Sequence, residues 1–108
     1  MAKTKYNRTP EGEMRIGALQ IARSKPNGFA TTAQAKAEMH LYVDLTPEDH
    51  AVSKTRPEPM YYQIVGNVVC HEGSSKSLFR KGYAIRNEED DGFTITHLGL
   101  THLASLGL

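Results

Sequence analysis

The hydrophobic pattern of this chain changes after Gly73. Before that glycine, apolar residues recur at the three- and four-residue spacing of helices in three main segments. After it, two short strand-like segments, 83–86 and 93–96, flank the polar turn NEEDDG, and a helix-like segment closes the chain. This order predicts an α+β, mostly helical fold with three main helices, a short extra helix, a two-stranded β-hairpin and a closing C-terminal helix.

Capping residues set the expected bounds of the helices. Thr9 and Pro10 open the first helix, because threonine caps a helix and proline suits its first position. Thr31 or Thr32 opens the second, and Thr96 opens the closing helix. The expected helices span residues 10–25, 32–44, 47–52, 59–71 and 97–106. Their expected core residues are Met14, Ala18, Ile21 and Ala22, then Tyr61, Ile64, Val65, Val68 and Val69, and finally Leu98, Leu103 and Leu106.

Size and composition favour a single domain. With 108 residues, 39% of them hydrophobic and 23% charged, the chain can bury one modest core. We expect a flexible basic arm over residues 1–9 and one domain over residues 10–108. Cys70 is the only cysteine, so no internal disulfide can form, and neither a leader nor an apolar run of about 20 residues is seen. These features predict a cytoplasmic protein without a membrane segment.

The order of elements resembles a winged helix-turn-helix domain, in which three helices precede a hairpin called the wing. The ending GYAIRNEEDDGFTITHLGLTHL is similar to such a wing, with a glycine before the first strand and then Thr96, Gly99 and Leu103 spaced as Thr-x-x-Gly-x-x-x-Leu. The segments LTPED and PMYYQIVGNVV are similar to the N-terminal winged-helix domain of Mrr-type restriction endonucleases. The resemblance covers about residues 12–106. It implies binding to double-stranded DNA, by a small transcriptional regulator or the recognition module of a restriction-like system.

The resemblance implies that the helix over residues 59–71 lies toward the DNA. Its outward face carries Tyr62, Gln63, Gly66 and Asn67, opposite the apolar stripe. Gln63 and Asn67 lie one turn apart, and their amides can both donate to and accept from an adenine edge in the major groove. Gly66 removes bulk beside them. We expect these four residues to read bases; the alternative is an ordinary solvated helix face.

Lysines and arginines before and after this helix are the expected phosphate contacts, although the net charge is only +1. The polar turn, Glu88 to Asp91, is acidic and would repel a phosphate backbone, so the wing is not expected to grip DNA by its tip. The expected phosphate contacts are Lys54, Arg56, Lys76, Arg80, Lys81 and Arg86, with Lys3, Lys5 and Arg8 in the arm.

Catalytic and metal-binding patterns are weak in this sequence. Cys70 and His71 are neighbours, so on a helix they point about 100° apart and do not easily share one ion. The spacings Cys-x-x-Cys and His-x-x-x-His do not occur. Paired carboxylates occur only in the turn over residues 88–91, and no phosphate-binding glycine loop is present. We therefore expect a protein that is not an enzyme and has no metal or cofactor.

A single DNA-binding module offers an interface of only about 600 to 1,000 Å², so useful specificity favours a dimer on paired half-sites. The closing helix, with its leucines and His102, is the expected homodimer surface. A protein-interaction module on the same scaffold is the alternative, with the acidic turn meeting a basic partner. A third possibility is that the chain is a piece of a larger enzyme.

Overall fold

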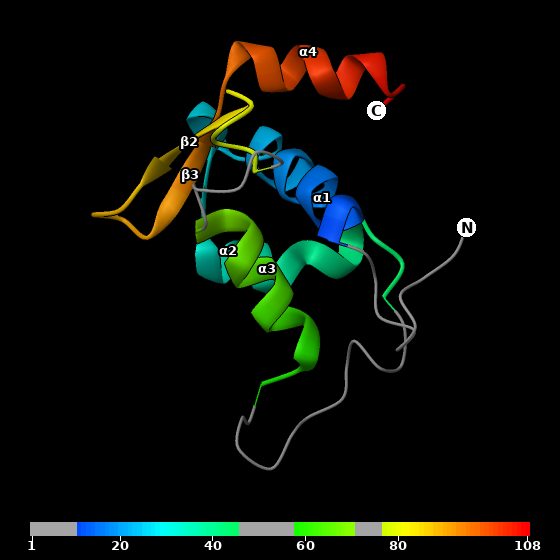
Figure 1. Cartoon of the computed structure of the whole chain (residues 1–108), viewed down its shortest axis with the longest axis vertical. Coiled ribbons are helices and arrows are strands. Elements are labelled where there is room, and N and C mark those ends of the chain that lie inside the picture. Colours follow the sequence, from blue (N-terminus) through cyan, green and yellow to red (C-terminus); the bar gives the residue numbers. More distant parts are fainter. Residues whose placement is uncertain (1–10, 46–57, 71–76) are drawn as a thin grey trace.

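The computed structural model describes residues 11–45, 58–70 and 77–108 (Figure 1). It confirms an α+β class with helices, a hairpin and a closing helix. The expected arm over residues 1–9 and the expected short helix over 47–52 lie outside the described residues. The elements are α1 (Glu11–Arg23), the 3-10 turn η1 (Pro26–Gly28), β1 (Phe29–Thr31), α2 (Thr32–Glu38), the 3-10 turn η2 (Met39–Leu41), α3 (Met60–Cys70), β2 (Ala84–Asn87), β3 (Gly92–Ile95) and α4 (His97–Ser105).

The core forms where α1, α2 and α3 pack against one another and α1 packs on the sheet. The predicted core faces of α1 and α3 are confirmed, because every expected residue is buried except Ile64, which is partly buried against the core. Periodic apolar residues force this arrangement, since burying them removes about 25 cal/mol of unfavourable hydration per Å². The fully buried residues of these two expected faces are Met14, Ala18, Ile21, Ala22, Val65 and Val69.

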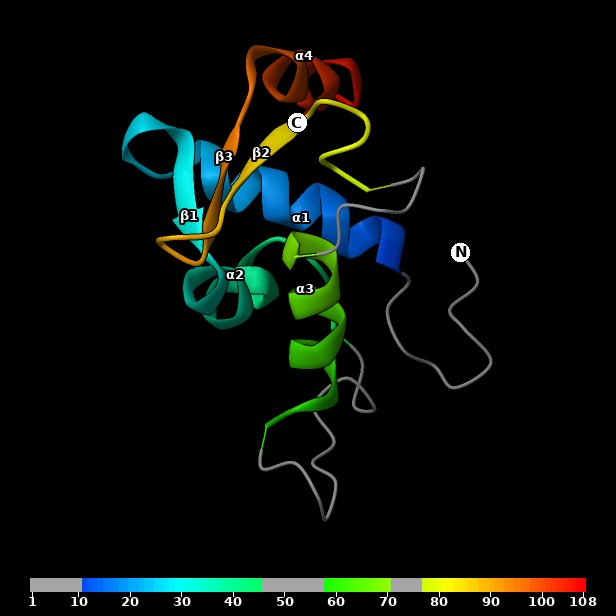
Figure 2. The ribbon, with the colours of Figure 1, turned by 60° about the vertical axis from the view of Figure 1, so that its left-hand side comes forward.

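A third strand accompanies the hairpin. Strand β1 pairs antiparallel with β3, as β2 does, so the sheet order is β1-β3-β2 with Phe93 of the central strand fully buried (Figure 2). The prediction of only two strands was therefore wrong. Strand β1 has three residues, which is too short to display an alternating pattern. Its pairing partners lie about sixty positions further along the chain, as in Ala30 opposite Phe93.

The second helix is shorter than predicted. Thr31 caps it in a capping box: its side chain accepts from the Gln34 backbone, and the Gln34 side chain accepts from the Thr31 backbone. The helix becomes a 3-10 turn at Met39 instead of continuing to residue 44. Met39 and Val43 press on Gly17 of α1, where a Cβ would lie 2.5 and 2.7 Å from their side chains. The change from α-helix to 3-10 turn thus occurs where Met39 packs against α1.

The Thr96, Gly99 and Leu103 pattern has a structural explanation. Thr96 caps α4 by accepting from the Gly99 backbone at 3.1 Å, and its hydroxyl donates to the Gly82 carbonyl at 2.6 Å. A Cβ at Gly99 would collide with the Tyr83 carbonyl oxygen, so only glycine lets the helix approach this closely. Leu103 is fully buried. The three residues together fix α4 at the end of the sheet.

The prediction that Leu98 and Leu106 anchor α4 in the core is wrong. Leu98 and Leu106 are 52% and 46% exposed, because only the side of α4 that carries Gly99 and Leu103 meets the body of the protein. In Figures 1 and 2, α4 lies at the opposite end of the sheet from α2. The same helix therefore leaves an apolar surface open to solvent.

Candidate nucleic-acid interface

The outer face of α3 carries the four residues predicted to read bases. Tyr61, Val65, Val68 and Val69 turn into the core, which leaves Gln63 exposed and Tyr62, Gly66 and Asn67 partly exposed on the other side. Within the described residues, the side chains of Gln63 and Asn67 form no hydrogen bond. Because residues four apart lie on the same helix face, both amides are available to one external surface.

Lys36 of α2 borders this face, although it was not among the residues predicted to contact DNA. Its ammonium lies 5.8 Å from the centre of the Tyr62 ring, within the range of a cation–π contact. A Cβ at Gly66 would lie 3.7 Å from Lys36 Cε, an ordinary contact. The α2–α3 packing creates this neighbour, and no local spacing in the sequence indicates it. A positive charge thus lies beside the candidate base-reading residues.

Tyr62 differs from the two amides because it already has aromatic contacts within the chain. Its ring meets that of Tyr61 edge-on, with ring centres 4.8 Å apart and an angle of 86° between the planes. Burial raises the pKa of Tyr61 to about 12, and the neighbouring Tyr62 adds to the shift. Tyr62 is therefore held in place beside the amides, and Gln63 and Asn67 remain the main candidates for base contacts.

Arg86 occupies an interior position and not the expected phosphate-contacting one. Its side chain is only 8% exposed, and its guanidinium pairs with the Asp91 carboxylate at 2.8 Å. It also donates to the Val69 and Gly92 carbonyl oxygens, both at 3.2 Å, and to the Thr32 hydroxyl at 3.3 Å. These bonds join the hairpin to α2 and to the end of α3. Arg86 is therefore engaged within the protein and is not placed to contact phosphate, contrary to the prediction.

The charges of this network stabilise each other. The hydrogen bond from Arg86 holds the pKa of Asp91 below its ordinary value, and a second one from the Thr32 hydroxyl, 2.9 Å long, acts in the same direction. Burial alone would lower the pKa of Arg86, but the hydrogen bond to Asp91 and nearby negative charges raise it. Both groups are therefore charged at neutral pH.

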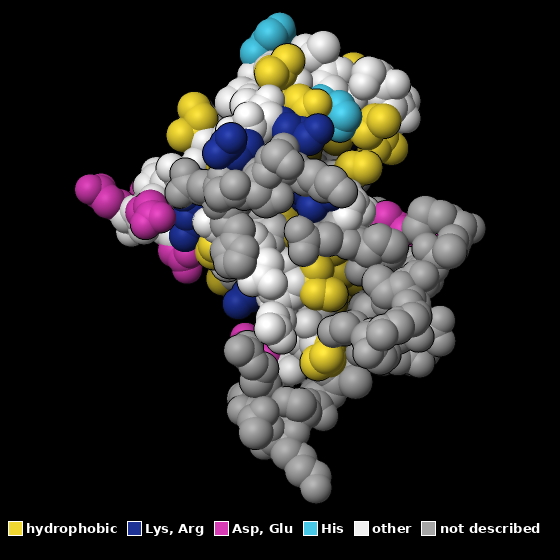
Figure 3. Space-filling model, viewed as in Figure 1, with side chains coloured by type: hydrophobic (Ala, Val, Ile, Leu, Met, Phe, Trp, Pro, Cys, Tyr) yellow, Lys and Arg dark blue, Asp and Glu magenta, His cyan; other side chains and the backbone are white. Residues whose placement is uncertain are grey.

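The hairpin turn remains acidic after Asp91 is accounted for. Glu88, Glu89 and Asp90 are exposed at the tip, and Asp90 is bonded to Asn87. Figure 3 shows Asp and Glu side chains at the outer end of the hairpin and Lys and Arg side chains closer to the body. Acidic side chains thus lie at the hairpin tip, and the exposed Arg80 and Lys81 lie on the turns before β2, near the base of the hairpin.

The other expected phosphate contacts have different outcomes. Arg80 and Lys81 are exposed on the turns before β2, where the Arg80 backbone donates to the Ser77 hydroxyl at 3.0 Å. These two side chains are accessible to a polyanion. The remaining predicted basic contacts lie outside the described residues: Lys54, Arg56, Lys76, Lys3, Lys5 and Arg8.

Metal-binding side chains, membrane helices and similarity to known proteins are the other features that can indicate function. Among the described residues, no three His, Cys, Asp or Glu side chains cluster closely enough to hold a metal ion. Nor does any helix in the described part of the chain have the length and apolar character needed to cross a membrane. Comparisons of the chain with protein-family models, curated proteins and solved structures gave no match.

Proposed function

We propose that this chain is a DNA-binding protein of winged helix-turn-helix architecture that reads duplex DNA through α3. The observation that carries the proposal is the pair of amides, Gln63 and Asn67, one turn apart on the outer face of a helix whose other face is core. The arrangement of α1, α2 and α3 beside a three-stranded sheet supports it.

Phosphate contacts in this proposal come from around α3 and from the base of the hairpin. Lys36 beside Tyr62 and Gly66 supplies one positive charge, and the exposed Arg80 and Lys81 supply two more. The acidic tip points away from the phosphates, because charges of the same sign repel. Positioning thus falls to the helices and the turns before β2.

We further propose that the protein acts in the cytoplasm as a homodimer, either as a small transcriptional regulator or as the recognition module of a restriction-like system. The apolar surface of α4 supports dimer formation: Leu98, Leu100, Leu106 and Leu108 are each at least 40% exposed on or just after this helix. Sedimentation equilibrium tests the dimer. The double variant Leu98→Glu/Leu106→Glu is expected to shift the protein to monomer, and a parent protein that is monomeric at about 100 μM contradicts this part of the proposal.

Fluorescence anisotropy with labelled random duplex DNA tests the main proposal. At low salt we expect binding at micromolar protein or below, weakening as salt rises because counterions are released. Arg80→Ala is expected to weaken binding to all sequences and to reduce the salt slope by about 1. Arg23→Ala, which removes an exposed arginine at the end of α1, is the matched control. Absence of binding at micromolar protein in low salt contradicts the proposal.

A protein-interaction module is the second candidate, and the exposed acidic tip favours it. Neutralising the tip separates the two functions. The double variant Glu88→Gln/Glu89→Gln is expected to strengthen DNA binding modestly, because two repulsive charges are removed. If the parent protein binds a basic protein or peptide and not DNA, and this variant loses that binding, the second candidate replaces the first.

A further inference from the structure

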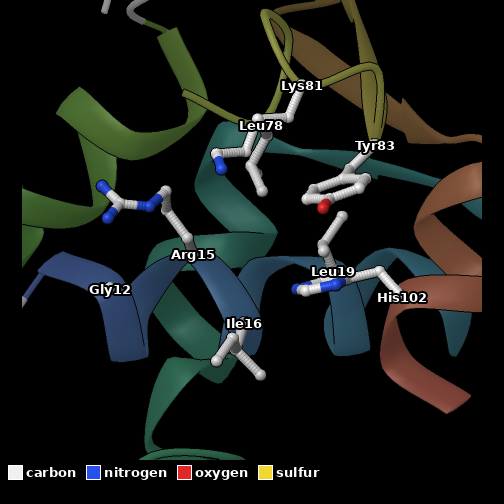
Figure 4. A pocket seen from close by; sticks show the side chains of 8 residues that line it. All are labelled: Gly12, Arg15, Ile16, Leu19, Leu78, Lys81, Tyr83 and His102. Carbon is white, nitrogen blue, oxygen red and sulfur yellow. The ribbon is translucent and has the colours of Figure 1, made fainter. Parts of the chain in front are cut away.

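A pocket of about 290 Å³ lies between α1, the turns over residues 77–83, and α4, and none of its described lining residues belongs to α3 (Figure 4). Its apolar part is formed by Ile16, Leu19 and Leu78. Leu19 and Leu78 are 1% and 2% exposed, so the floor of the pocket belongs to the core. A pocket built on core side chains keeps its shape, because those side chains are closely packed on their other sides.

The polar groups of the pocket favour an anion. Arg15 from α1 and Lys81 from the turn both line it, and none of its described lining residues is acidic. Figure 4 shows these two side chains and Tyr83 around one space. Arg15 also has an interaction of its own within the chain. The exposed Lys81, at the edge of an apolar surface, is therefore the charge that attracts a negatively charged group.

One wall of the pocket is a stacked pair of rings. Tyr83 and His102 lie with ring centres 4.3 Å apart and planes only 8° from parallel. The Tyr83 backbone is also fixed, because its N–H donates to the Leu78 carbonyl at 2.9 Å and its carbonyl accepts from Thr96 at 2.9 Å. This wall connects the turns before β2 with α4. It supplies a flat face and a hydroxyl to whatever occupies the pocket.

We propose that this pocket binds a small organic carboxylate. The apolar body of the ligand lies on Ile16, Leu19 and Leu78, and its carboxylate faces Lys81. The volume is at the lower end for ligand sites and accommodates a molecule of about ten non-hydrogen atoms. Lys81 is also a proposed phosphate contact, but the inference does not depend on DNA binding, because it is tested on the free protein without DNA.

Phenylacetate, with one ring, one carboxylate and about ten non-hydrogen atoms, is a suitable probe. A ¹H–¹⁵N NMR titration of the full chain is expected to show saturable shifts at Leu78, Tyr83 and His102 in the millimolar range. Lys81→Ala is expected to weaken binding about fivefold, the change that corresponds to the upper end for an exposed ion pair. Lys81→Arg is expected to restore it.

Arg80→Ala is the matched control, because Arg80 is the neighbouring exposed cation and does not line the pocket. It is expected to leave phenylacetate binding unchanged. Neutral benzyl alcohol and inorganic phosphate are expected to bind more weakly, since each lacks one of the two features of the ligand. Equal shifts with either compound, or an unchanged affinity in Lys81→Ala, overturn the proposal.

Discussion

Two groups of polar side chains lie at α3, and they differ in how many hydrogen bonds they form within the protein. At the end of the helix, the terminal nitrogens of the Arg86 guanidinium donate to the Val69 carbonyl and to Asp91, and its side chain is only 8% exposed. Its Nε is the one buried side-chain nitrogen of the described residues that lacks a hydrogen-bond partner. On the outer face, Gln63 and Asn67 form no side-chain hydrogen bond within the described residues. Polar residues that look alike in the sequence therefore divide into those that build the fold and those that remain available to a partner. The first group should control stability and the second binding.

The largest expected effect is on the first group. Arg86→Ala is expected to lower the free energy of unfolding by about 3 kcal/mol, because the Val69 and Gly92 carbonyls lose a donor in a buried place. Urea unfolding measures the change. Arg80→Ala, the exposed arginine nearby, is expected to stay within about 0.5 kcal/mol of the parent. Equal stability of the two variants would show that the Arg86 network does not hold the fold.

The next largest effect is expected on DNA sequence preference, when the outer-face amides of α3 are removed. Gln63→Ala and Asn67→Ala are each expected to cost about 1 to 3 kcal/mol in the preference for a selected duplex over a scrambled one. Their unfolding free energies should change by no more than about 0.5 kcal/mol. Anisotropy with a duplex selected from a random library measures the preference. Gln20→Ala removes an amide from α1 and is the control; a loss of preference there as large as in α3 contradicts a role for the α3 amides.

A smaller effect is expected at the acidic side of the Arg86 network. Asp91→Asn should cost about 1 kcal/mol at neutral pH, because the carboxylate is 70% exposed and therefore screened by water. The folded pKa of Asp91 is depressed, so its contribution is present above the ordinary carboxylate pKa and is lost as pH falls through the folded value. The stabilities of the parent and the variant should thus begin to converge as pH falls below about 4.

Asp90→Asn provides the control for this pH dependence. Asp90 lies at the exposed tip, bonded to Asn87 and not to Arg86. Its stability difference from the parent should be small at neutral pH. A parent-minus-variant difference for Asp91→Asn that stays constant from pH 7 to pH 3 contradicts an ionised Asp91 that stabilises the fold.

The helices were predictable because their information is local. The apolar stripes of α1 and α3 predicted the buried faces. Two capping positions, Thr31 or Thr32 for α2 and Thr96 for α4, predicted the starts of these helices, and the cap of α2 is Thr31. Strand β1 was not predictable, because three residues carry no period and their partners come from the other end of the chain. The exposed leucines of α4 were misassigned for a related reason: a nine-residue helix can present several apolar faces, and tertiary packing selects one.

The candidate site was predictable only in part. The outward direction of Gln63 and Asn67 follows from the stripe on the opposite face of the same helix. The position of Arg86 does not, since its partners are spread over α2, α3 and the hairpin. Lys36 was missed because it reaches α3 from another helix. A lysine or arginine in the sequence can therefore be assigned to phosphate contact only when the structure shows whether its side chain is already bonded within the protein.

Gly66→Ala gives the most sensitive test of the difference between folding and binding residues, because it should raise stability and lower DNA affinity. Gly66→Ala places a Cβ at an ordinary 3.7 Å from Lys36 Cε, so it fits and should raise stability by up to about 1 kcal/mol through helix propensity. DNA affinity should fall, since the added methyl lies beside the amides at the proposed point of close approach. Gly12→Ala on α1, whose Cβ would also make an ordinary contact at 3.6 Å, should stabilise without changing DNA affinity. If Gly66→Ala binds DNA as tightly as the parent, the DNA does not approach α3 closely at this residue.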